Sequence, residues 1–193
     1  VGLHRLAPVL RRYRTLYPDV QLDIQFEDSE AAHDLIRQGR AELAVVTLDP
    51  QGEADLTYLR LWDDSLHFVT ACEHPLALRG RLTLDELAGY GSVLPGTVTY
   101  TGRIVLETFE ARGLTLQPAL STNYLETIGM LVGAGLGWSV LPRSLLTDDL
   151  VELDVDAPHL HRTLGCVTNP GRTLSNAARS FIAVLRETRE PGI

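Results

Sequence analysis

Residues 122–142, TNYLETIGMLVGAGLGWSVLP, have the pattern of a helix, a tight turn and a strand. Asn123 is a good N-cap, and Glu126 can reach back to the backbone amide of that cap. Apolar residues recur at helical spacing through the stretch. The glycines of residues 133–137 then allow a sharp reversal, and an apolar strand runs on to Pro142. We therefore expect the start of this helix at the mouth of a sheet.

The start of that helix is a candidate anion site. Its first N–H groups have no partner within the helix, and they carry partial positive charge. A carboxylate or another small anion could bind them. A capped helix that only packs against its neighbours is the commoner arrangement, so this signal is weak by itself.

Composition restricts the class of protein. The chain has 193 residues, 45% of them hydrophobic, which is typical of a soluble globular protein. A formal charge of −8 argues against direct binding of nucleic acid, which needs clustered basic residues. The sequence contains no apolar run of membrane-spanning length and no signal-peptide pattern, so we expect a cytoplasmic protein. The helical pattern at Val1 suggests that an upstream part has been removed.

The first helix is predicted over residues 3–17, where apolar residues form one face. Four arginines, at positions 5, 11, 12 and 14, lie on the other face. They could contact phosphate, but a solvated face or a contact between subunits is the more frequent role of such a pattern.

A βαβ unit is predicted next. Apolar and polar residues alternate over 20–27, as in a half-buried strand, and a helix over 30–38 and an apolar strand over 43–46 follow. Such units bind ligands at the carboxyl ends of their strands, which nominates Ser29 and Thr47. Hydroxyl residues in loops usually serve only as turn or cap residues, so each signal is weak alone.

The middle of the chain predicts a second α/β half. Strands are expected over 58–61, 66–71 and 92–94, with a short helix capped by Thr83 and Glu86 between the last two. A boundary between two segments is expected at residues 74–77, HPLA, before that helix.

The loop 95–101, PGTVTYT, is rich in hydroxyls and joins the strand at 92–94 to a helix that ends at Gly113. Here too the end of a strand meets the start of a helix. Short strands at 120–122, 151–153 and 163–168 and a last helix from about Ser175 complete the prediction.

No enzyme or metal motif is complete. The segment 137–141, GWSVL, lacks the second glycine of a nucleophile elbow, and the glycines of 133–137 follow a helix where a dinucleotide loop would precede one. His159 and His161 could share a metal, but no Cys or second His pair stands nearby in the sequence. Cys72 and Cys166 have no metal spacing. We therefore expect no catalytic residues, metal or cofactor, and reduced cysteines.

Several short motifs occur in an order and spacing that resemble the C-terminal effector-binding domain of LysR-type transcriptional regulators. These are LAPVLRRY at 6–13, YPDV at 17–20, Gly39, LAVVT at 43–47, HPLA at 74–77, GLG at 135–137, LP at 141–142, LS at 174–175 and Phe181. The resemblance covers nearly the whole chain. It implies an α/β fold of two Rossmann-like subdomains joined by two crossover strands, like type 2 periplasmic-binding proteins.

On this pattern, the first subdomain comprises residues 1–70 plus 167–193 and the second comprises 71–166, with Cys72 and Cys166 near the crossovers. Family members usually carry a winged helix-turn-helix DNA-binding domain upstream, and also a strand and a Ser/Thr-rich loop before the first helix. None of these is in this sequence. Their absence would leave a sheet edge unpaired, which invites association.

The resemblance also implies the binding site. The family places effector contacts at positions that match six residues here, Ser29, Thr47, Gly96, Thr97, Thr99 and Asn123. Tyr124 and Trp138, with Tyr100, could form a wall for an apolar part of the ligand.

The expected function is therefore that of a sensor rather than an enzyme. A small, carboxylate-like metabolite would bind between the subdomains, and the signal would pass through dimer or tetramer contacts to a DNA-binding domain outside this chain. The first helix is the candidate contact. The alternative is a periplasmic-type solute-binding protein of a transporter, against which the unpaired cysteines and the missing export signal count. An enzyme on the same scaffold ranks third.

Overall fold

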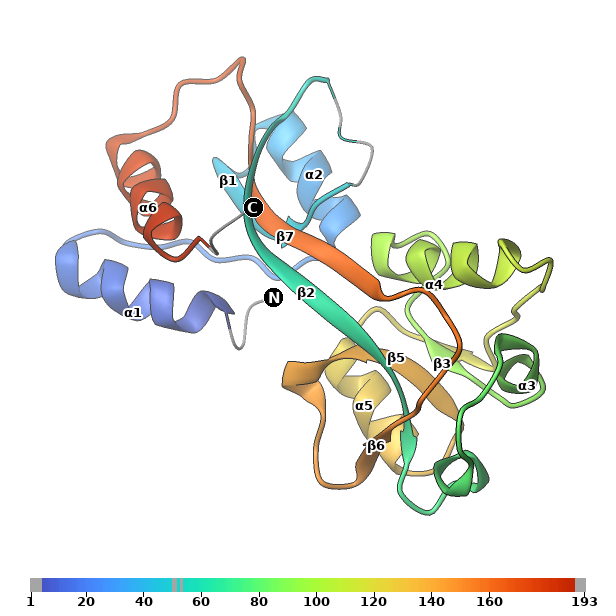
Figure 1. Cartoon of the computed structure of the whole chain (residues 1–193). Coiled ribbons are helices and arrows are strands. Elements are labelled where there is room, and N and C mark those ends of the chain that lie inside the picture. Colours follow the sequence, from blue (N-terminus) through green and yellow to red (C-terminus); the bar gives the residue numbers. More distant parts are fainter. Residues whose placement is uncertain (1–4, 50–51, 53, 190–193) are drawn as a thin grey trace. The chain divides into compact units, whose positions relative to one another are not determined.

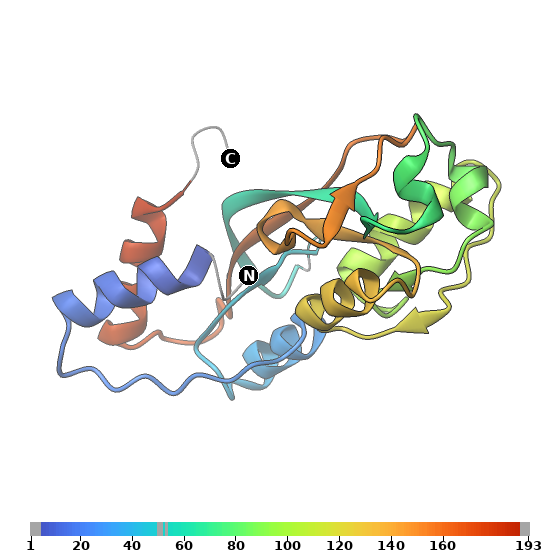
Figure 2. The same ribbon diagram turned by 90° about the horizontal axis from the view of Figure 1, so that it is seen from below.

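The computed structural model describes residues 5–49, 52 and 54–189 and divides the chain into two compact units. Unit 1 comprises Val1–Asp64 and Arg162–Ile193, and unit 2 comprises Ser65–His161. The chain passes between them twice, within the long strands β2 (Thr57–Ala71) and β7 (Leu160–Thr168), which are hydrogen-bonded neighbours (Figures 1 and 2). Both passages come earlier in the chain than the expected boundaries after residues 70 and 166.

Among its described residues, unit 1 contains three α-helices and one further strand, α1 (Ala7–Leu16), α2 (Ser29–Gln38), α6 (Asn176–Glu187) and β1 (Leu43–Thr47). Strand β1 pairs antiparallel with β7, with Val45 opposite Cys166. Tyr13 of α1 packs edge-on against Phe181 of α6, with ring centroids 5.0 Å apart, and its hydroxyl donates to the carbonyl of Ala177 at 2.8 Å. These contacts bury Tyr13 of the predicted apolar face, but Leu16 at the end of the helix is 50% exposed, and residues 3 and 4 of the predicted helix lie outside the described part.

The helix α2 covers the predicted range, 30–38, and begins one residue earlier, at Ser29. The side chain of Asp28 caps it by accepting from the amide of Ala31 at 2.8 Å. Gly39 ends it in the left-handed conformation, with φ of 68°, which glycine adopts without steric cost. Ile36 is fully buried against Val46 and Val167, so the helix covers the sheet through its apolar face.

The strand predicted over residues 20–27 is not formed, and this prediction is wrong. These residues belong to no helix or strand, and Ile24 and Phe26 are 47% and 86% exposed. Alternation gives a segment the side-chain pattern of a strand, but a strand also needs a neighbour to complete its hydrogen bonds. Among the described strands, β1 is at the end of the sheet order and pairs with β7, so the βαβ unit lacks its first strand.

Unit 2 contains part of a five-stranded sheet, which also includes β1 and β7, together with a separate two-stranded sheet and three α-helices. Strands β5 (Trp138–Pro142) and β6 (Leu150–Glu152) pair antiparallel with β2, and β3 (Val93–Leu94) pairs parallel with β4 (Leu120–Ser121). The helices are α3 (Leu84–Ala88), α4 (Tyr100–Glu110) and α5 (Leu125–Gly133), with 3₁₀ helices at Pro75–Leu78 and Arg143–Leu145.

One correction concerns β2, which was predicted as two strands. The polar residues of 63–65 suggested a break, but they stay extended because β7 lies alongside them. The resulting strand has 15 residues and serves both units.

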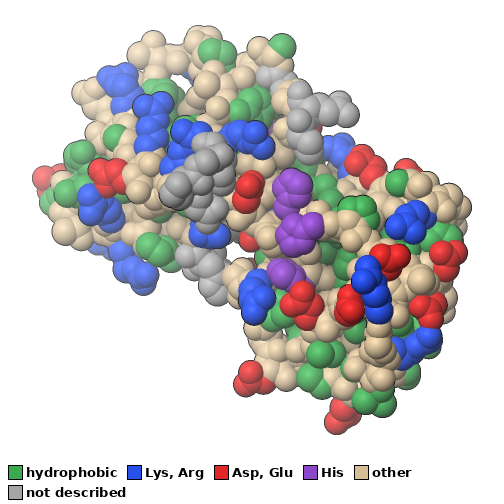
Figure 3. Space-filling model, viewed as in Figure 1, with side chains coloured by type: hydrophobic (Ala, Val, Ile, Leu, Met, Phe, Trp, Pro, Cys, Tyr) green, Lys and Arg blue, Asp and Glu red, His purple; other side chains and the backbone are tan. Residues whose placement is uncertain are grey.

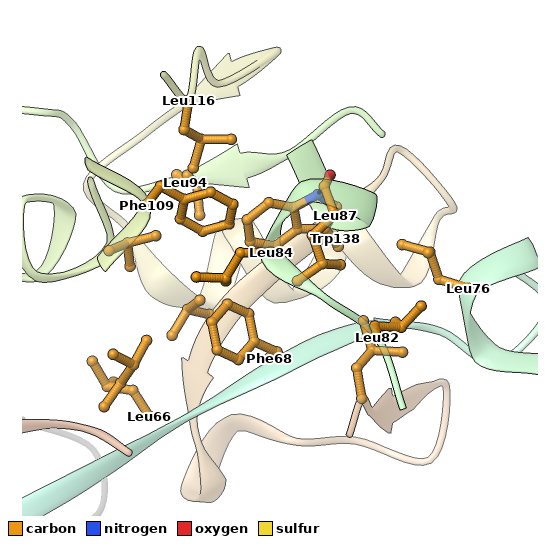
Figure 4. Packing of buried hydrophobic residues seen from close by; sticks show 14 residues of the cluster. Leu66, Phe68, Leu76, Leu82, Leu84, Leu87, Leu94, Phe109, Leu116 and Trp138 are labelled. Atoms are coloured by element: carbon orange, nitrogen blue, oxygen red, sulfur yellow. Dashed lines mark hydrogen bonds between the residues drawn. The ribbon is translucent and has the colours of Figure 1, made fainter. Parts of the chain in front are cut away.

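The core of unit 2 is built around Trp138 (Figure 4). Its indole is fully buried, stacks with the ring of Phe109 at 5.6 Å between centroids, and donates its N–H to the carbonyl of Leu87 at 2.9 Å. The indole therefore ties β5 to α3 and α4. Thr83 and Glu86 form the predicted capping box at the start of α3.

The predicted cap of α5 is wrong. The N-cap position is Tyr124, which makes no side-chain cap hydrogen bond. The predicted cap residue, Asn123, uses its carboxamide oxygen to accept from the backbone amide of Gly96 instead. Within the described residues, no helix has the length and apolar character needed to cross a membrane.

Candidate functional site

In unit 2, the loop between β3 and α4 folds back onto the start of α4. The Thr99 side chain caps the helix by accepting from the amide of Gly102 at 3.1 Å. Its hydroxyl donates to the carbonyl of Gly96 at 2.8 Å, and its own backbone amide donates to the same carbonyl at 2.9 Å. Two sequence-predicted residues, Gly96 and Thr99, are therefore held in one tight turn.

Asn123 joins this turn from the start of α5. Its carboxamide oxygen accepts from the amide of Gly96 at 3.1 Å. Thr97 is exposed at the tip of the loop, and Tyr124 is 73% exposed. Four of the predicted residues, Gly96, Thr97, Thr99 and Asn123, thus gather at the start of α4, and we call them the unit 2 half-site.

The electrostatics of this half-site favour an anion. The first turn of α4 contains no acidic residue, so no carboxylate of its own offsets the positive end of the helix. It contains a cation instead, Arg103. This residue is exposed, and its guanidinium carbon lies 4.7 Å from the centroid of the Tyr100 ring. A basic residue in the first turn disfavours the helix unless an anion is bound nearby.

Arg103 is the residue that the sequence reasoning missed. Its position was available as a signal, since an arginine in the first turn after a hydroxyl-rich loop is unfavourable for the helix alone.

In unit 1, the predicted residues Ser29 and Thr47 lie together. The amide of Thr47 donates to the Ser29 hydroxyl oxygen at 3.1 Å, which links the end of β1 to the start of α2. Thr47 is only 4% exposed. His33, one turn into the helix, is buried with its Nδ1 2.6 Å from the carbonyl oxygen of Ser29. We call Ser29 and Thr47 the unit 1 half-site.

The unit 1 half-site has a different charge character. Asp28 caps α2 and Glu30 lies in its first turn, so carboxylates already offset the positive end of this helix. A second anion is less favourable here than at α4. Hydroxyl or amino groups of a ligand suit this site better.

The prediction for Trp138 is wrong. The indole has no exposed surface and its N–H is satisfied by Leu87, so it is a core residue of unit 2 rather than the wall of a site. Tyr100 is also buried, with 5% exposed. The indole packs within a cluster of buried apolar residues, so Trp138 stabilises the core and does not line a ligand site.

A separate groove of about 490 Å³ lies on unit 2 and contains none of the predicted residues. It is lined by segments 66–68, 152–155 and 157–160. The imidazole of His67 in this groove is already paired with Glu152, at 2.6 Å between Nδ1 and Oε1, and His159 Nε2 lies 3.3 Å from the Ser65 hydroxyl. Among the described residues, no group of three or more side chains could hold a metal ion.

Both cysteines are free thiols, Cys72 exposed and Cys166 buried. Burial raises the pKa of Cys166 to about 12, so this thiol stays protonated and unreactive at neutral pH.

Comparison with known proteins places the chain in a family. The family model described as LysR substrate binding domain matches residues 1–190. Similar curated proteins are the HTH-type transcriptional regulators YybE and CysL of Bacillus subtilis. They are 25% and 22% identical to this chain over 94% and 96% of it. The chain spans only 62% and 64% of the length of these relatives.

Solved structures agree on the fold. The effector binding domain of QuiR in complex with shikimate is similar with a TM-score of 0.85 at 17% identity, covering 96% of this chain and 90% of that one. The Synechocystis PCC6803 CcmR regulatory domain in complex with 2-PG also gives 0.85, at 21% identity over 99% and 94%. These similarities confirm the expected α/β fold, like that of type 2 periplasmic-binding proteins. The chain belongs to the LysR substrate binding domain family.

Proposed function

We propose that this chain is the effector-sensing domain of a LysR-type transcriptional regulator, not an enzyme, and that its effector is a small anionic metabolite bound through a carboxylate. The start of α4 is the observation that carries this proposal. Its first turn has exposed Arg103 and no acidic residue, and Thr99 and Asn123 fix the loop above it. A helix start with an added cation favours an anion.

The relatives support the same class of ligand. QuiR was solved with shikimate, which is a carboxylate, and CcmR with 2-PG. The different charge of the two half-sites decides where we expect the carboxylate of the effector. It should bind at the unit 2 half-site, where no carboxylate of the helix offsets its positive end.

A thermal-shift screen tests the ligand class. Small carboxylates should raise the melting temperature, because a ligand that binds only the native state stabilises it by mass action. Matched amides, which lack the charge, should not. The Arg103→Gln protein should bind the same carboxylate roughly three- to tenfold more weakly, the effect of one partly exposed charge.

Arg112→Gln is the matched control, since Arg112 is also exposed but follows the far end of α4. It should leave the affinity unchanged. Equal shifts with carboxylates and amides, or equal losses in the two arginine variants, would remove α4 as the anion site.

The regulatory signal requires partners outside this chain. We propose that the domain forms homodimers or tetramers through α1 and contacts DNA only through another domain of the full-length protein, in the cytoplasm. Helix α1 buries Val9 and Tyr13 against unit 1 but leaves Leu16 50% exposed and Tyr17 38% exposed. Arginine side chains gather over α1 and α6 on the face shown in Figure 3.

A charged residue in the exposed end of α1 should therefore disrupt assembly. We expect the Leu16→Glu protein to sediment as a monomer at concentrations where the unchanged domain is dimeric, because burying the carboxylate in an interface is costly. Leu78→Glu is the control, since Leu78 is 89% exposed in unit 2. A Leu16→Glu protein that stays dimeric would exclude this end of α1 from the contact.

A further inference from the structure

A largely buried ion pair lies at the two points where the chain passes between the units. Asp64 is the last residue of unit 1 on β2, and Arg162 is the first residue of unit 1 on β7. The Nε and Nη2 atoms of Arg162 donate to Asp64 Oδ2 at 2.9 and 2.8 Å. Each passage of the chain therefore carries one half of the same pair.

This pair is unusual in its burial. Arg162 is 6% exposed, and the side chain of Asp64 is 14% exposed. Removing two charges from water costs about as much as their attraction returns, so an apolar pair of similar size would stabilise the fold at least as well. The best-attested advantage of a buried ion pair is that it fixes register, because a slipped strand would leave both charges without a partner.

The neighbouring residues point to the same role. The Thr163 hydroxyl accepts from Arg60 Nη2 at 3.1 Å and lies 3.4 Å from Asp63 Oδ1, so further polar links join β2 and β7 beside the pair. Segments 60–65 and 160–163 contain no glycine or proline, the residues that often mark a bulge or bend in a strand. At Gly165 the two backbones approach so closely that a Cβ atom would lie inside 3.0 Å of the Leu59 carbonyl oxygen.

We propose that Asp64 and Arg162 form a clamp that locks the register of β2 and β7 where the chain passes between the units. With the clamp in place, β2 and β7 can bend together but cannot slide past one another. Any change that an effector produces between the units must then pass through strands of fixed register. This inference does not depend on the nature of the effector, and its test needs no ligand.

Hydrogen exchange followed by mass spectrometry tests the clamp in the whole chain. The decisive variant combines Asp64→Leu with Arg162→Met, which fills the site with apolar side chains and removes both charges. We expect amides of 62–65 and 161–164 to exchange about tenfold faster, while the cores of both units keep their protection or gain some. The reversed pair, Asp64→Arg with Arg162→Asp, should restore slow exchange more fully than either single change.

The exposed pair of Arg81 and Asp156, 2.6 Å apart and 66% and 52% exposed, supplies the control. Arg81→Gln should leave exchange in both passages unchanged. If the apolar double variant exchanges at the unchanged rate in 62–65 and 161–164, the pair does not set the register and the proposal fails. Faster exchange spread evenly through unit 1 would also overturn it, because that result indicates only lost stability.

Discussion

Replacing Trp138 by alanine is expected to lower the free energy of unfolding by about 4 kcal/mol, the range for a large aromatic residue in a core. The indole is fully buried, so its removal leaves a cavity between β5, α3 and α4. It also removes the stacking on Phe109 and leaves the Leu87 carbonyl without its 2.9 Å donor. Urea unfolding followed by far-ultraviolet circular dichroism measures the change.

The conservative change Trp138→Phe separates these contributions. A phenyl ring keeps most of the packing but cannot donate to Leu87, so we expect a loss of roughly 1–2 kcal/mol. Leu78→Ala, at a residue that is 89% exposed, should change stability by less than about 0.5 kcal/mol. A loss for Trp138→Ala no larger than that of Leu78→Ala would contradict the core role and reopen the question of a ligand wall.

The sequence predicted best those elements whose signals are local. The helix predicted over residues 30–38 and the Thr83 and Glu86 capping box depend on residues a few positions apart, and the structure confirms them. The first strand failed because its formation depends on a partner distant in the sequence. The alternation of residues 20–27 is real, yet Phe26 is 86% exposed because no described strand lies beside it to complete a sheet.

Competition for one hydrogen-bonding group explains the error at α5. Asn123 has the properties of an N-cap, but its carboxamide oxygen is used by the amide of Gly96, which is 27 residues away in the sequence. A local rule cannot anticipate such a partner. The same contact brings Asn123 to the loop that precedes α4.

The candidate site was predicted only in part for a related reason. Strand ends and family motifs identified Gly96, Thr99, Ser29 and Thr47, whose hydrogen bonds fall into two local groups. For Trp138 and Arg103, the outcome depended on the direction of the side chain, which the sequence does not show. Trp138 turns into the core, while Arg103 is exposed at the start of α4.

Gly102→Ala is expected to weaken effector binding on the order of a hundredfold, because it displaces the loop that forms the unit 2 half-site. Alanine normally stabilises a helix by up to about 1 kcal/mol relative to glycine. At Gly102, however, a Cβ atom would lie well inside 3.0 Å of the Gly96 carbonyl oxygen, and a backbone atom cannot swing away as a side chain can. The turn must open, which breaks the 2.8 Å hydrogen bond from Thr99 and shifts the amide that Asn123 holds.

Gly129→Ala is the matched control, because Gly129 lies within α5 and its added Cβ would meet Leu141 Cδ1 at an ordinary 3.6 Å. This variant should gain about 0.5–1 kcal/mol of stability and keep its affinity. Titration of the carboxylate found in the thermal-shift screen, together with urea unfolding of both variants, measures the two effects separately. If Gly102→Ala bound the carboxylate as tightly as Gly129→Ala does, the loop before α4 would not be part of the effector site, and the proposed role of Gly96, Thr97 and Thr99 would have to be abandoned.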